Sequence, residues 1–153
     1  MTLKEAVELA KKGRAYAQRT KYREAMAFYN KALSIDPKFA EGWFLRASTL
    51  IDTGKPEEAL VDCERALALN PNYADAWSKK ALAFFNLERF EEGVLAATRA
   101  STLNGNDAMA WYIKGVCLDE LGKSDEAQVA YGKSLELEII LDMDAERKKV
   151  GKS

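Results

Sequence analysis

The sequence predicts an all-α fold: a right-handed α-solenoid of four antiparallel helix pairs that ends in an extended C-terminal capping helix. Two observations support this prediction. The chain repeats itself every 34 residues, and each repeat contains two stretches of helical periodicity joined by a short turn. Because one unit of this size cannot bury its apolar side alone, consecutive units are expected to stack into a continuous core.

The repeat is counted from Ala6, Ala40, Ala74 and Ala108. The eighth, twentieth and twenty-seventh places hold only glycine, alanine or serine in all four units. The fourth place holds Leu9 in the first unit and, in the others, all three tryptophans of the chain. The sequence therefore predicts a single domain over residues 1–153. Its repeats are expected at about 6–39, 40–73, 74–107 and 108–141, with a helical extension and tail at 142–153.

The motif residues follow a fixed order in each repeat. They are Trp43, Ala47, Ala59, Ala66 and Pro71 in the second repeat, and Trp111, Gly115, Ala127 and Tyr131 in the fourth. This order resembles the tetratricopeptide repeat family, whose unit reads W-x2-L-G-x2-Y, then A-x3-F, A and P. The resemblance covers residues 6 to about 141. It implies that the first helix of each pair lines a concave face and that the chain is a non-catalytic module for protein–protein interaction.

Turn residues place the helices within each repeat. Gly54 is expected in a left-handed conformation after a helix, and Pro56 at the first position of the next helix. Thr2 and Glu5 have the spacing of a capping box at the start of the first helix. The expected helices are 3–19, 22–35, 40–53, 56–69, 74–87, 90–103, about 107 to the turn at 122–123, and one long helix from 124 to 149.

Composition argues against several other functions. The net charge of −1 gives no field that would attract nucleic acid or an anionic membrane, and the chain has no histidine for general-base catalysis or metal binding. Gly122-Lys123-Ser124 lacks the upstream glycine of a phosphate-binding loop. Cys63 and Cys117 fit no zinc or redox spacing and are expected to be buried thiols. We therefore expect no enzyme activity, cofactor or metal. In the absence of an apolar spanning run or a secretory signal, a cytoplasmic location is expected.

The concave face that the resemblance implies is expected to form a groove for a peptide or helix of a partner protein. Phe44, Met109 and Tyr112 would be its apolar anchors, with an acidic end of the ligand near Arg14 and a basic end near Glu120. Leu45, Leu82 and Ile113 belong either to this groove or to the core between repeats. The predicted groove residues are Lys11, Arg14, Glu41, Phe44, Ser48, Asp75, Ser78, Lys79, Met109, Tyr112, Val116, Asp119 and Glu120.

Many proteins of the resembled family bind the C-terminal carboxylate of chaperones through a clamp of lysines, asparagines and an arginine. The corresponding places here are Ala10, Arg14, Leu45, Asp75 and Lys79. Only Lys79 has the expected charge, and Asp75 would repel a carboxylate. The sequence therefore disfavours the clamp, while a co-chaperone-type adaptor without it stays an alternative.

The last helix departs from the repeat, because Ile139 stands where proline ends the first two units. Ile139, Ile140, Leu141 and Met143 form an apolar cluster near its end. We expect this cluster to pack back on the fourth repeat. The alternative is a homodimer or structural scaffold formed through the C-terminal helix, with the groove idle or filled by a neighbour's tail.

Overall fold

The computed structural model describes residues 2–152, which form eight helices and no strand. Every expected helix is present, and the ends lie within one residue of the predicted ones. The helices are α1 (Leu3–Gln18), α2 (Tyr22–Ile35), α3 (Ala40–Asp52), α4 (Pro56–Leu69), α5 (Ala74–Asn86), α6 (Phe90–Leu103), α7 (Ala108–Glu120) and α8 (Ser124–Val150).

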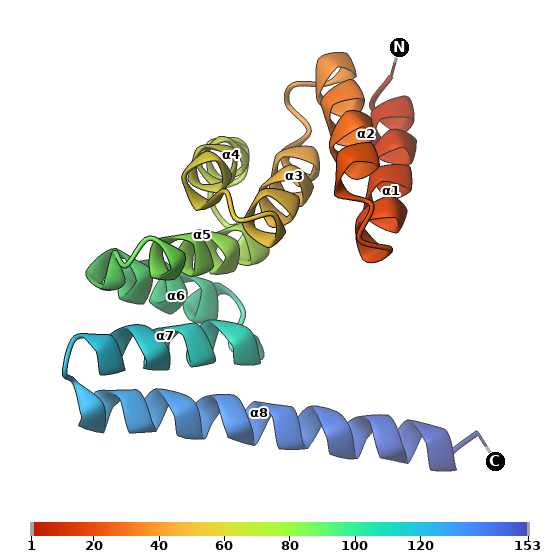
Figure 1. The fold of residues 1–153 in the computed structure, drawn as a ribbon. Coiled ribbons are helices and arrows are strands. Elements are labelled where there is room, and N and C mark those ends of the chain that lie inside the picture. The colour runs from red at the N-terminus through yellow and green to blue at the C-terminus, as the bar shows by residue number, and fades with distance from the viewer. Residues whose placement is uncertain (1, 153) are drawn as a thin grey trace.

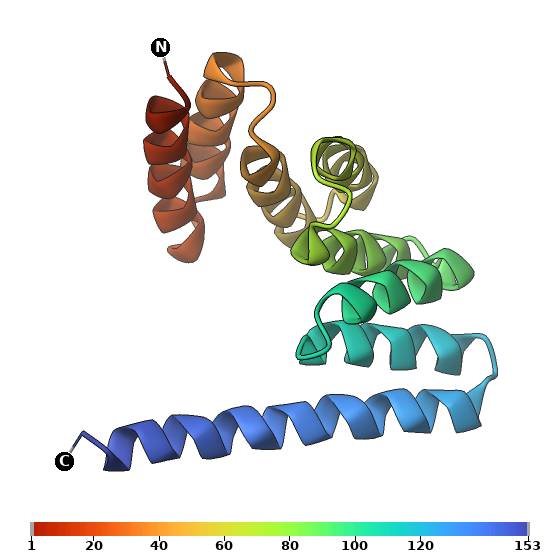
Figure 2. The same cartoon turned by 180° about the vertical axis from the view of Figure 1, so that it is seen from behind.

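The helices form four consecutive hairpins that stack along a curved path (Figures 1 and 2). Each first helix contacts the first helix of the next hairpin, so α1 touches α3, α3 touches α5 and α5 touches α7. Within residues 2–152, no two of the second helices α2, α4, α6 and α8 touch each other. The first helices are therefore crowded on the inner side of the curve and the second helices are spread on the outer side. This is the predicted α-solenoid, and its concave face is built by α1, α3, α5 and α7.

The small residue at the eighth place makes room for the helix beside it. A Cβ atom on Gly13 would lie 2.6 Å from Cε1 of the Tyr29 ring, and a Cβ atom on Gly115 would lie 2.6 Å from the Tyr131 ring. In the second and third repeats, the partner place holds Cys63 or an alanine, and the eighth place holds alanine. Glycine thus occurs where the facing side chain is an aromatic ring, because close packing leaves no space for both.

The turn inside each hairpin requires a left-handed residue at the fifteenth place. Gly54 and Gly122 have φ of 77° there, as expected for glycine. Thr20 and Glu88 take the same conformation, with φ of 59° and 58°, although a Cβ atom disfavours it. The first and third hairpins therefore contain a strained residue that the second and fourth avoid.

The predicted capping box at the start of α1 is wrong. Thr2 precedes the helix, but its side chain makes no capping hydrogen bond. The amide of Glu5, which the box would use, donates instead to the backbone carbonyl of Thr2 at 3.0 Å. A side-chain cap is present at α7, where the Asp107 carboxylate accepts a hydrogen bond from the Ala110 amide at 3.1 Å.

The three tryptophans occupy equivalent positions beside the end of the preceding repeat. Trp43 Nε1 donates to the carbonyl of Pro37 at 2.8 Å, and Trp77 Nε1 donates to that of Pro71 at 2.9 Å. Gly105 replaces the proline before the fourth repeat, and Trp111 Nε1 is buried with no hydrogen-bond partner among residues 2–152. The substitution of proline therefore coincides with the loss of one contact between consecutive repeats.

The second repeat contains a buried ion pair that the third and fourth lack. Arg46 donates to both carboxylate oxygens of Asp62, at 2.7 and 2.9 Å, and to Asn30 of the first repeat at 2.8 Å. The Asp62 side chain is only 3% exposed. The places of Asp62 in the next two repeats hold Ala96 and Ala130.

The expectation that the apolar cluster of α8 packs back on the fourth repeat is wrong. Residues 138–150 are all exposed, and Ile139, Ile140, Leu141 and Met143 are 46–55% exposed. The reason is length: α7 has 13 residues, whereas α8 has 27, runs back along α7 and continues well beyond the start of α7 (Figure 1). We call residues 138–150 the α8 extension.

Candidate binding surface

The first helices carry most of the predicted groove residues on one exposed face. Phe44, Ser48, Lys79 and Val116 are half-buried, and Ser78 is buried. The remaining members of the predicted set are exposed, namely Lys11, Arg14, Glu41, Asp75, Met109, Tyr112, Asp119 and Glu120.

Ser78 was predicted to be exposed, and this prediction is wrong. It occupies the fifth place of its repeat, as do Ala10, Phe44 and Tyr112. Ala10 and Ser78 are 2% and 9% exposed, Phe44 is half-buried, and Tyr112 is 51% exposed. The fifth place therefore faces the following repeat. Among residues 2–152 it is open in the fourth repeat, the last one in this part of the chain.

Phe44 is consequently less available as an anchor than predicted. Its ring packs against that of Tyr73 with centroids 5.2 Å apart, and it contacts the cluster of Ala66, Leu67 and Ala76 between the second and third repeats. Leu45 and Ile113, whose role the sequence left open, are 8% and 2% exposed and belong to the core. Leu82 packs against the core cluster of the third and fourth repeats.

The N-terminal part of the face contains charges gathered around Tyr73, which the sequence analysis did not identify. Burial raises the pKa of Tyr73, the carboxylates of Glu41 and Asp75 raise it further, and Arg14 lowers it. These three charges come from α3, α5 and α1, so the stack brings three repeats together there. An aromatic residue in the same place one repeat earlier, Phe39, was the available signal.

The C-terminal part contains a second aromatic pair. Tyr112 lies with its ring centroid 5.8 Å from that of Tyr131, and the Tyr131 hydroxyl donates to Asp119 at 3.1 Å. Burial and the Asp119 carboxylate raise the pKa of Tyr131 to about 12. Met109, on the same helix as Tyr112, is 58% exposed. This end of the face thus combines exposed apolar surface with negative charge.

Charge along the face follows the predicted direction only at its two ends. Lys11 and Arg14 lie on α1, where Lys11 pairs with Glu8 at 3.3 Å, and Asp119 and Glu120 lie at the end of α7. Between them, acidic residues also occur on α3 and α5. Arg14 is therefore the N-terminal basic residue most available to an acidic group.

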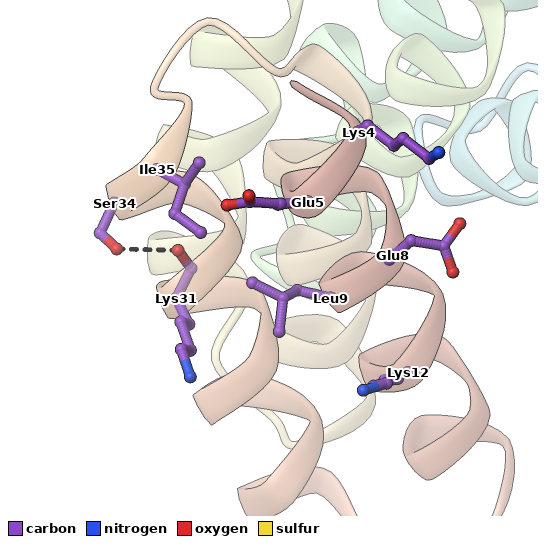
Figure 3. A pocket seen from close by; sticks show the side chains of 8 residues that line it. All are labelled: Lys4, Glu5, Glu8, Leu9, Lys12, Lys31, Ser34 and Ile35. Atoms are coloured by element: carbon purple, nitrogen blue, oxygen red, sulfur yellow. Dashed lines mark hydrogen bonds between the residues drawn. The ribbon is translucent and has the colours of Figure 1, made fainter. Parts of the chain in front are cut away.

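A separate hollow of about 530 Å³ lies between α1 and α2 (Figure 3). Leu9 and Ile35 lie at its centre, and Lys31 and Glu5 lie beside them. Leu9 stands at the place that a tryptophan fills in the later repeats, so the smaller side chain accounts for the open space. The sequence showed the replacement but did not predict the hollow. The fourth place lies on a different side of α1 from the predicted groove residues.

Metal-binding clusters, reactive thiols and membrane-spanning helices are the other features that bear on function. Within residues 2–152, no group of three histidine, cysteine, aspartate or glutamate side chains is arranged to hold a metal ion. Cys63 and Cys117 are buried free thiols, and burial raises their pKa values to about 12 and about 11. No helix in this part of the chain has the length and apolarity needed to cross a membrane.

Comparisons with known families identify the repeat. Residues 40–73 match the model of the tetratricopeptide repeat, residues 13–54 match that of the TPR repeat, and residues 57–134 match that of anaphase-promoting complex, cyclosome, subunit 3. No curated protein sequence matches this chain.

Solved structures agree with these matches. The first TPR domain of Spaghetti (RPAP3), bound to the HSP90 peptide SRMEEVD, is 30% identical with a TM-score of 0.77, over 80% of this chain and 97% of that one. The Sgt2 TPR domain from Aspergillus fumigatus is 26% identical with a TM-score of 0.74, over 79% and 82% of the two chains. MamA shares the fold at 24% identity and a TM-score of 0.80, over 90% and 81%. The chain belongs to the tetratricopeptide repeat family.

Proposed function

We propose that this chain is a non-catalytic interaction module that binds a peptide or helix of a partner protein on its concave face. The observation that carries the proposal is the exposed pair Met109 and Tyr112, 58% and 51% exposed, beside the carboxylates of Asp119 and Glu120. Exposed apolar side chains gathered beside charged residues are typical of interaction sites. Tyrosine is also enriched among residues that dominate binding energy.

The likeness to the RPAP3 domain supports a peptide as the ligand, since that domain is bound to an HSP90 peptide. The residues here favour a different peptide. Two of the five places of the carboxylate clamp, Ala10 and Leu45, are buried apolar residues, and Asp75 places an exposed carboxylate where the ligand's own carboxylate would bind. We therefore propose an adaptor that does not use the clamp, whether or not its partner is a chaperone.

The charges suggest the direction of the ligand. A basic residue of the partner would lie near Asp119 and Glu120, an apolar residue on Met109 and Tyr112, and an acidic residue near Arg14. Charge complementarity of this kind fixes the register and suppresses wrong partners more than it adds affinity.

Selection of peptides from a random library, followed by calorimetry, tests the proposal. A Met109→Ala/Tyr112→Ala variant should raise the dissociation constant of selected peptides at least about tenfold, which corresponds to a loss of about 1.4 kcal/mol of binding free energy. The matched control is Val61→Ala/Leu95→Ala on the second helices, where the side chains are 48% and 71% exposed. The peptide SRMEEVD serves as a second probe and should bind more weakly than the selected peptides. Equal affinity for the wild type and both variants would exclude the concave site.

A second candidate function is self-association through the α8 extension. It is favoured by the exposure of Ile139, Ile140, Leu141 and Met143, which are 46–55% exposed. Light scattering over a range of concentrations tests it, since a mass that stays that of one chain contradicts it. A cytoplasmic location stays a prediction from the sequence.

A further inference from the structure

The fourth repeat leaves its stacking face open. The twenty-eighth place holds Leu33 and Leu67 in the first two repeats, where they are 6% and 8% exposed beneath the following hairpin. The same place in the fourth repeat holds Leu135, which is 58% exposed. Tyr112, at the fifth place, is uncovered in the same way. We call the face formed by Tyr112, Tyr131 and Leu135 the end face. In the earlier repeats, the equivalent face is covered by the first helix of the next repeat.

The end face has an acidic border, of which Asp119 is the residue that the internal stacking faces lack. Ile51 and Phe85 occupy the twelfth place in the second and third repeats and pack against the core there, whereas the fourth repeat has Asp119. Glu120 and Asp125 lie exposed on either side of the turn between α7 and α8. The places of Glu120 and Asp125 are acidic in the second repeat too, where they hold Asp52 and Glu57. A helix seated on the end face would meet apolar surface along its middle and negative charge near this turn.

The α8 extension has the length of the helix that the end face would accept. The second helices α2, α4 and α6 each have 14 residues, and the first helices α3, α5 and α7 each have 13. Helix α8, with 27 residues, is as long as one of each joined end to end. Because it is continuous, the extension points away from its own end face instead of folding back onto it (Figure 2).

The side chains of the extension complement the end face. Ile139 and Met143 follow Leu135 at steps of four residues, so the three lie along one side of α8. Beyond them come Arg147, Lys148 and Lys149, which are exposed. The extension thus has an apolar middle and a basic end, and the end face has an apolar middle and an acidic border.

We propose that two copies of this chain associate so that the α8 extension of each lies on the end face of the other, in the position of the first helix of a fifth repeat. The proposal rests on the self-association candidate described above and specifies its geometry. The two α8 helices run antiparallel about a two-fold axis near residues 137–138. In this arrangement, Arg147 and Lys149 of one copy approach Glu120 and Asp125 of the other.

A second copy fits this surface better than an unrelated helix, because one symmetric contact covers both exposed surfaces of each chain at once. A two-fold interface is self-complementary, and it closes without leaving a free end face for further growth. It removes Leu135, Ile139 and Met143 from water in both copies. The complementary charges fix the antiparallel register.

The test is analytical ultracentrifugation of the full chain and of charge-reversed variants. The wild type should form a dimer. The dimer dissociation constant should rise at least tenfold in each of two variants, Arg147→Glu/Lys149→Glu and Glu120→Lys/Asp125→Lys, because like charges then face each other. Mixing the two variants should restore a dimer of one copy of each, since both contacts then join opposite charges. The matched control is Asp52→Lys/Glu57→Lys, which changes the same places in the second repeat and should leave the dimer unaffected.

Three results would overturn the proposal, and they separate it from the functions above. A wild type that stays monomeric excludes self-association altogether. A dimer that Ile139→Glu/Met143→Glu breaks but that Glu120→Lys/Asp125→Lys leaves intact excludes the end face while keeping self-association through the extension. A mixture of the two reversed variants that stays monomeric excludes the antiparallel register. Peptide binding to the concave face is measured separately, with a Met109→Ala variant, because Tyr112 belongs to both surfaces. A failure of peptide binding leaves the dimer results unchanged.

Discussion

The second and fourth repeats have the same plan and differ in what covers them. Leu67 and Leu135 occupy the same place, yet one is 8% exposed and the other 58%. The ring of Phe44 packs against that of Tyr73 in the next loop, whereas the ring of Tyr112 packs against that of Tyr131 in its own hairpin. The comparison teaches that a place in this repeat acquires its role from the neighbouring unit. The same position is core inside the stack and a binding surface at its end.

The largest expected difference between the two repeats concerns the buried ion pair. Arg46→Ala should lower the free energy of unfolding by about 3 kcal/mol, because the buried Asp62 carboxylate loses two charge-assisted hydrogen bonds and keeps the longer contact to Arg65 at 3.8 Å. Lys114→Ala, at the same place in the fourth repeat, removes only a cation 5.3 Å from the Trp111 ring centroid and should cost about 0.5 kcal/mol. Urea unfolding followed by circular dichroism measures both. Equal losses would contradict the comparison.

The next largest difference is expected at the twenty-eighth place. Leu67→Ala should cost about 2–3 kcal/mol, because it leaves a cavity among Ala66, Ala76 and the flanking aromatic rings. Leu135→Ala should cost less than about 1 kcal/mol in the monomer, since its side chain already contacts water. Thermal unfolding at low protein concentration distinguishes the two. A large loss for Leu135→Ala under these conditions would show that the fourth repeat is covered from within the chain.

A smaller effect is expected at the hairpin turns. Glu88→Gly should raise the free energy of unfolding by about 0.5–1 kcal/mol, because it removes a Cβ atom from a residue with φ of 58°. Gly54→Ala should lower it by about 1 kcal/mol, since the new residue would have to adopt φ near 77°. Denaturation midpoints of the two variants should therefore move in opposite directions, and movement in the same direction would contradict the turn argument.

The smallest expected effect is on pH dependence. Burial raises the pKa values of Cys63 and Cys117 above the free value of 9.0, to about 12 and about 11, so the unfolded chain loses these protons first. The stability that the two protonated thiols contribute is fully present below pH 9. It is lost as the pH rises from 9 toward the pKa values of the thiols in the folded chain. At pH 9, each thiol should lower the free energy of unfolding by about 0.4 kcal/mol. A Cys63→Ala/Cys117→Ala variant should show a flatter alkaline dependence in urea titrations, and an unchanged slope would contradict buried thiols.

The sequence was sufficient for the fold because the repeat is a local pattern. Periodicity, the turn glycines and the helix-ending prolines lie within each unit, and they placed every helix to within a residue. The capping box failed because sequence spacing does not reveal that a backbone carbonyl already accepts the hydrogen bond of the Glu5 amide.

The candidate surface was predicted less well, because exposure depends on packing between units. Ser78 is polar and lies at a place assigned to the groove, yet the next repeat covers it. Tyr73 lies in a loop outside the motif, and only the stacking of three repeats brings Arg14, Glu41 and Asp75 around it. The covered length of α8 depends on where α7 begins, because the apolar cluster of α8 lies beyond that point.

The three indole rings differ in their hydrogen bonding, so they can serve as intrinsic fluorescence probes of different parts of the chain. Trp43 and Trp77 donate to carbonyl groups, whereas Trp111 Nε1 has no partner among the described residues. Indole emission responds to the polarity of its surroundings, so each ring reports on one junction between units. Replacing two of the three with phenylalanine would allow unravelling to be followed from either end by fluorescence, without attaching a dye.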